Sequence, residues 1–199
     1  MTPDKRLGLV LVINVVMILG LLSVGLAAGS LGVLASGADY FGDALGTGLS
    51  LAALRMSRDP HGHPRATSYA ALVNASLLLI VTMAVIFEAA YRLSMGAPSI
   101  DGLPVVLVSL VAAAAMIACA LILGDVADDL NMQSVMLDTV ADAAAALGVA
   151  VSGAVILVTG ELFWLDSVVA LIIAVVIGYH AAKLLRSVLA DLHGESPSW

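Results

Sequence analysis

Six long apolar runs divide this chain, and they limit what it can fold into more than any other feature. They cover residues 7–28, 32–54, 68–93, 103–123, 132–158 and 163–189. Each is long enough for a helix to cross a hydrocarbon core of about 30 Å. Because lipid offers no hydrogen bonds to the backbone, such segments cross as helices. The sequence therefore predicts an all-α polytopic membrane protein with six transmembrane helices.

The linkers between the runs are short and turn-like, so residues 1–199 are expected to form a single transmembrane domain without a soluble C-terminal domain. The first run is too long for the apolar part of a signal peptide and is interpreted as a retained helix. Basic residues set the orientation, because they favour the cytoplasmic side. With both termini in the cytoplasm, Arg92 alone falls near the other face, and seven residues fall inside: Lys5, Arg6, Arg55, Arg58, Arg65, Lys183 and Arg186.

Composition excludes several other classes of protein. A hydrophobic content of 61% exceeds what a soluble domain of this size needs. The net charge of −7 argues against a nucleic-acid partner. The single cysteine, Cys119, excludes a disulfide within the chain. No hydrolytic triad, P-loop or dinucleotide-binding pattern is present, so we expect a protein that is not an enzyme.

Two pairs of acidic residues interrupt the apolar runs. Asp39 and Asp43 lie in the second run, and Asp138 and Asp142 lie in the fifth. Residues four apart share one face of a helix, so each pair presents its carboxylates together. One ionised carboxylate at mid-bilayer costs about 2.5–3.5 kcal/mol on insertion scales. Neither run contains a Lys or Arg that could compensate this cost.

A divalent cation that exchanges with protons is the simplest compensation for these carboxylates. Carboxylates must lose protons to bind a metal, so metal and protons compete for the same oxygens. This competition predicts a metal/proton antiporter. A passive cation channel and a non-transporting membrane metal receptor would use the same acidic site. A structural alternative places the aspartates at helix ends, in the headgroup region.

Several segments in chain order resemble the transmembrane domain of the cation diffusion facilitator family of metal/proton antiporters. The first is Gly-Ser-Leu-Gly-Val-Leu-Ala at 29–35, followed by the Asp-x-x-x-Asp pair at 39–43. Residues 59–65 are similar to the family's His-rich loop, and 70–75 and 88–93 are similar to the two ends of its third helix. Residues 131–142 are similar to the family's fifth helix, which carries the second motif of this kind, and Asp166 with 171–174 is similar to the sixth helix.

The resemblance implies that Asp39, Asp43, Asp138 and Asp142 form the transport site. It also implies a homodimer that exports metal from the cytoplasm, in a bacterial inner membrane. Zinc is the family's usual ion. However, Asp138 stands where many zinc-selective members have His, and a set of oxygen ligands favours harder ions such as manganese and makes iron and cobalt more plausible. Zinc still accepts carboxylates, and cadmium is the remaining candidate ion.

Two further departures concern the loop and the C-terminus. Asp59, His61 and His63 are candidates for an accessory metal site at the cytoplasmic mouth, and a solvated turn is the alternative. Asp59 and Thr67 stand where the family's loop usually has His and Glu, which weakens the accessory-site interpretation. The family's cytoplasmic C-terminal domain is not found before Trp199, so the chain is either a short member of the family or a truncated form of a longer one.

Overall fold

Six long helices make up the described part of the protein in a computed structural model, which describes residues 3–57, 66–124 and 130–193. The helices are α1 (Pro3–Ala28), α2 (Leu31–Ser57), α3 (Ala66–Met95), α4 (Gly102–Gly124), α5 (Leu130–Thr159) and α6 (Trp164–His193). Within the described ranges there is no strand. The predicted all-α membrane fold is therefore confirmed.

Most of the helices extend beyond the apolar runs that predicted them. Helix α1 begins at Pro3, four residues before its run, because the polar residues Asp4, Lys5 and Arg6 continue the same helix. Among the described residues, every helix except α2 contains a stretch long and apolar enough to cross a membrane. Helix α2 is the least apolar of the six, and it carries Asp39 and Asp43.

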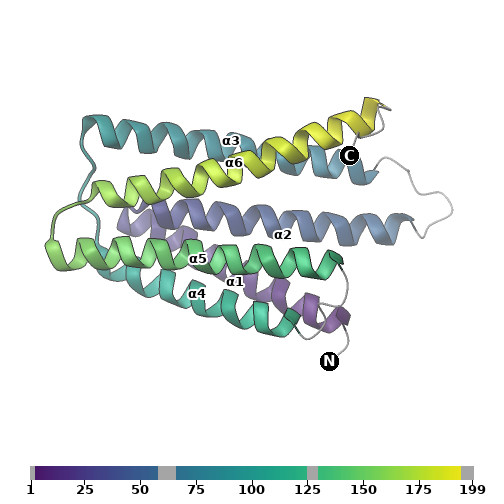
Figure 1. Cartoon of the computed structure of the whole chain (residues 1–199), viewed down its shortest axis with the longest axis horizontal. Helices are drawn as coiled ribbons and strands as arrows, with labels where there is room; N and C mark the ends of the chain where they lie inside the picture. Colours follow the sequence, from purple (N-terminus) through teal and green to yellow (C-terminus); the bar gives the residue numbers. More distant parts are fainter. Residues whose placement is uncertain (1–2, 58–65, 125–129, 194–199) are drawn as a thin grey trace.

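Helix α2 lies in the middle of the bundle. It contacts α1, α3, α5 and α6, while α4 packs mainly on α5 and α3 packs mainly on α6 (Figure 1). Consecutive helices alternate in direction, so α1 begins and α6 ends at the same end of the bundle, called here the terminal end (Figure 1). The central position of α2 brings its aspartates next to helices from both halves of the chain.

A tight turn at the opposite end joins α1 to α2. Gly29 has a φ of 70°, which glycine adopts without strain, and the N–H of Ser30 donates to Gly25 O at 3.1 Å. The Ser30 hydroxyl then caps α2 by accepting a hydrogen bond from Val33 N at 3.1 Å. These contacts fix where α2 begins, and therefore how deep in the bundle its aspartates lie.

The core between the helices is apolar and closely packed. Its largest fully buried side chains include Leu21, Val33, Tyr40, Met116 and Ile156. Many large apolar side chains point outward instead; Leu26, Phe87 and Val158 are each at least 70% exposed. An apolar surface this extensive is expected where lipid is the surrounding solvent.

Candidate metal centre

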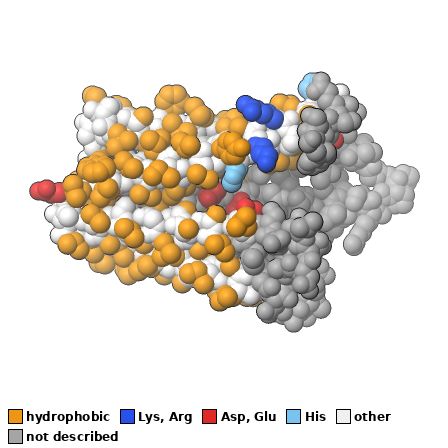
Figure 2. All heavy atoms as spheres, in the orientation of Figure 1, with side chains coloured by type: hydrophobic (Ala, Val, Ile, Leu, Met, Phe, Trp, Pro, Cys, Tyr) orange, Lys and Arg blue, Asp and Glu red, His pale blue; other side chains and the backbone are white. Residues whose placement is uncertain are grey.

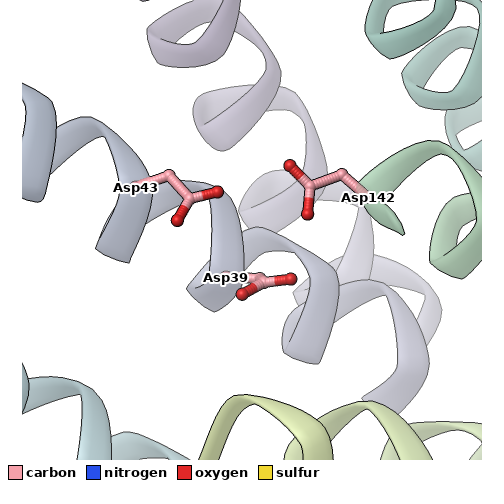
Figure 3. Close-up of side chains that lie close together, drawn as sticks. All are labelled: Asp39, Asp43 and Asp142. Carbon is pink, nitrogen blue, oxygen red and sulfur yellow. The ribbon is translucent and has the colours of Figure 1, made fainter. Parts of the chain in front are cut away.

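Three aspartates from two helices converge near the middle of the bundle. Asp39 and Asp43 project from successive turns of α2, and Asp142 projects toward them from α5 (Figure 3). One carboxylate oxygen from each lies within 4.8 Å of the others. The sequence spacing predicted that each pair shares a helix face, and the fold places α2 and α5 in contact. Residues about a hundred positions apart therefore form one cluster.

The cluster is sheltered on one side and open on the other. Asp142 is 9% exposed, Asp39 is partly exposed and Asp43 is exposed. Figure 2 shows acidic side chains and a histidine together near the middle of one face, between large apolar areas. Asp43 therefore forms the accessible side of the cluster and Asp142 its sheltered side.

The donor set fits a divalent cation. Oxygen ligands at about 2.0–2.2 Å from zinc, or slightly farther from a larger ion, lie about 3–4 Å from one another. A contraction of roughly 1 Å would bring the three oxygens into that range. Among the described side chains, no Lys or Arg pairs with any of the three carboxylates. When two of the carboxylates are both ionised, they repel each other by about 4 kcal/mol at a separation of 4 Å and an effective dielectric of 20. A bound cation would relieve this repulsion.

Asp138 lies outside this three-carboxylate cluster. It sits one turn from Asp142 on α5, toward the terminal end, and its side chain is exposed. The structure therefore brings together three of the four aspartates expected at the site and places the fourth nearby. The accessory candidates Asp59, His61 and His63 lie outside the described residues.

Asn74 of α3 is a polar neighbour of the cluster that the sequence analysis did not assign to the site. It is 6% exposed, and its Nδ2 donates to Gly42 O at 3.4 Å, beside Asp43. Its Oδ1 is buried with no hydrogen-bond partner among the described residues. The signal in the sequence was an amide within an apolar run, which by itself does not show which helix it faces.

Comparison with known proteins supports the resemblance seen in the motifs. The model of the cation efflux transmembrane domain matches residues 7–193. A zinc transporter ZitB from Yersinia pseudotuberculosis is 28% identical over 87% of this chain and 57% of its own length. A second ZitB, from Pectobacterium atrosepticum, is 26% identical over 98% of this chain and 63% of its own.

A third relative, from Bacillus velezensis, is named a cadmium, cobalt and zinc/H(+)-K(+) antiporter; it is 25% identical over 87% of this chain and 60% of its own length. The chain thus spans about three fifths of the curated relatives it matches. The match to a cation efflux transmembrane domain, together with the apolar helices, confirms the predictions of an integral membrane protein and of a protein that is not an enzyme. The chain belongs to the cation efflux family, the cation diffusion facilitators that its motifs resemble.

Proposed function

We propose that this protein exports a divalent transition-metal ion from the cytoplasm in exchange for protons. Asp39, Asp43 and Asp142 hold the ion, and Asp138 is a fourth ligand, one turn nearer the terminal end. The observation that carries the proposal is the meeting of three carboxylates from α2 and α5 within 4.8 Å, in a bundle with an apolar outer surface.

Proton exchange follows from the same carboxylates. Protonation neutralises the cluster and removes its ligand capacity, and metal binding requires the protons to leave. Helices that expose the cluster to one side of the membrane at a time would thereby couple the two fluxes. The names of the relatives, which include zinc, cadmium and cobalt transport and an antiporter, support zinc first and cadmium or cobalt next. We also propose a homodimer with both termini in the cytoplasm, on the strength of the family and of the basic residues.

Transport by purified protein in liposomes tests this function. Vesicles with an imposed pH difference should accumulate zinc above its external concentration, because an antiporter couples zinc movement to the proton gradient. Asp43→Asn and Asp142→Asn should each lower the rate by about 100-fold or more, since loss of a metal ligand costs at least what loss of a supporting residue does. Asp101→Asn is the matched control, because Asp101 is exposed and lies outside the cluster.

A passive channel would give a different result in the same vesicles. It would let zinc equilibrate but would never concentrate it, whatever the pH difference. Binding without any flux would instead indicate a metal receptor. Wild-type transport by both aspartate variants would show that the cluster is not the transport site.

A further inference from the structure

His180 is a metal-ligating side chain close to the cluster that the four-aspartate site does not use. It lies on α6, and its side chain is exposed. Its ring lies against that of the neighbouring Tyr179, with 5.8 Å between the ring centroids. An ionisable side chain in a membrane helix is a candidate for an ion site, and His180 lies three residues before Lys183, toward the terminal end.

The register of α5 and α6 places His180 at the level of Asp138. Near the other end of the bundle, Val169 of α6 faces Gly148 of α5, where an added Cβ would lie 4.0 Å from Val169 Cγ1. His180 lies eleven residues beyond Val169, which is about three helical turns, so it returns to within about 20° of the same face. Asp138 lies ten residues from Gly148 in the same direction along the bundle, or about 15 Å.

A second landmark relates His180 to α2. Asp166, in the first turn of α6, accepts hydrogen bonds from Leu31 N at 2.6 Å and Gly32 N at 3.2 Å. The two helices run in the same direction from this contact (Figure 1). His180 therefore lies about 3–4 Å, which is less than one turn, beyond the level of Asp43. The electrostatic interactions agree with this register, because the His180 ring interacts with the carboxyl groups of both Asp43 and Asp138.

We infer that His180 and Asp138, together with the exposed side of Asp43, form an outer binding position for the transported ion, one turn from the three-carboxylate cluster. This inference rests on the proposed function. The position offers one imidazole nitrogen with carboxylate oxygens, a set suited to zinc, cobalt or cadmium rather than to manganese or magnesium. Asp43 belongs to both positions and would pass the ion between them.

The outer position explains two features that the three-carboxylate cluster does not explain: the place of Asp138 outside the cluster, and the absence of a nitrogen ligand from α5. Asp138 lies outside the three-carboxylate cluster but at the level of His180 on α6, which offers it a second donor for metal binding there. The nitrogen ligand missing from α5, where Asp138 replaces a histidine found in many zinc-selective relatives, is supplied from α6. Zinc preference can then persist in a chain whose α2 and α5 provide only oxygens.

Calorimetry on the purified full chain tests the inference with zinc and manganese. His180→Ala should weaken zinc binding by about tenfold or more, and should change manganese binding by less than about twofold. His193→Ala is the matched control, because His193 is exposed on the last turn of the same helix, with its Nδ1 on Leu189 O at 2.7 Å. If His180→Ala binds zinc as the wild type does, the outer position is wrong.

X-ray absorption of the zinc-loaded protein gives a readout that a folding defect would not mimic. Because His61 and His63 could also supply imidazole, the measurement is made on a chain with both changed to Ala. Imidazole scattering should be present there, absent after His180→Gln and retained after His193→Gln. Its absence before His180 is changed would overturn the inference.

A double-mutant cycle separates this inference from the proposed function. Asp138→Asn and His180→Ala should be strongly non-additive for zinc if they share one ion, and additive if they do not. Asp142→Asn should weaken the binding of both zinc and manganese in either case. Suppose that Asp142→Asn loses the binding of both zinc and manganese, while the effects of Asp138→Asn and His180→Ala on zinc binding simply add. The proposed function would then stand, and the outer position would be wrong. Wild-type binding of both metals in Asp142→Asn would remove the proposed function.

Discussion

At the scale of single residues, Asp142 should lower the stability of the metal-free protein. It is 9% exposed and lies within 4.8 Å of two other carboxylates with no basic partner among the described side chains. Asp142→Asn removes the charge that this side chain carries when it is deprotonated. At a pH above the range where the cluster titrates, we therefore expect the free energy of unfolding without metal to rise by about 0.5–2 kcal/mol.

The same substitution should reduce the stabilisation that zinc gives to the wild type, since the ligand raises the unfolding temperature by binding to the native state. Thermal unfolding in detergent, with and without zinc, measures both effects. Asp101→Asn should change neither. A metal-free Asp142→Asn protein that unfolds below the wild type would show that the carboxylate has a structural role instead.

The aspartate pairs could be predicted because their spacing and their apolar surroundings are both local properties of the sequence. The placement of Asp138 outside the cluster and of His180 near it could not. Both depend on the register at which α5 and α6 pack, and that register is set by distant contacts such as Val169 with Gly148. Nothing near His180 in the sequence resembles a metal site, so its sequence context alone does not indicate this role.

At the scale of helices, Asp166 ties α6 to the start of α2. It is fully buried and accepts hydrogen bonds from the Ser30 hydroxyl at 2.6 Å and from Leu31 N and Gly32 N. Asp166→Ala leaves three buried donors unpaired, so we expect a loss of about 3–5 kcal/mol in the free energy of unfolding.

Asp166→Asn keeps one acceptor oxygen and should lose less than Asp166→Ala. Ser30→Ala, which removes one donor and the cap of α2, should cost about 1–2 kcal/mol. Unfolding by denaturant in detergent ranks the three variants. Equal stability of Asp166→Ala and the wild type would mean that this contact does not hold α2 in place.

A second contact between helices sets how closely α4 approaches α5. A Cβ added at Gly102 would lie 2.7 Å from Gly153 O, and one added at Gly153 would lie 2.7 Å from Val105 Cγ1. Alanine at either position should therefore separate the helices and cost about 1–3 kcal/mol. Gly20→Ala is the control, because nothing lies within 4 Å of its added Cβ and alanine favours the helix.

Gly153→Ala combined with Val105→Ala should recover part of the loss, because the clash is with the Val105 side chain. Gly102→Ala should not be recovered in this way, because it meets backbone. Thermal unfolding in detergent distinguishes these cases. Equal stability of all the glycine variants would contradict the close approach of α4 and α5.

At the scale of the whole molecule, the helix count and the order of the helices followed from the apolar runs alone, because each run had to be satisfied within lipid. The runs could not show that α3 packs on α6 or that α2 lies at the centre. Those pairings depend on shape and on a few long-range polar contacts, such as Arg92 of α3, whose Nη1 donates to Gly29 O at 2.8 Å. The position of the metal centre depends both on the apolar runs, which define the helices, and on the long-range contacts, which decide how the helices pack.

The exchange of metal for protons makes a prediction that involves the entire bundle. Lowering the pH protonates the carboxylates and removes metal ligands, so zinc affinity should fall as the pH falls. If two protons leave per ion bound, the apparent dissociation constant should rise by about 100-fold per pH unit in the range where the cluster titrates. The number of protons is measured by calorimetry in buffers that differ in ionisation enthalpy.

The proton number should then reappear in transport. Two protons exchanged per zinc ion carry no net charge, so zinc flux driven by a pH difference should be insensitive to an imposed membrane potential. A different number should make the flux depend on that potential, with a sign set by the excess charge. Zinc binding that releases no protons would contradict the exchange mechanism even if zinc crosses the membrane, because the carboxylates would then have been free of protons before the ion arrived.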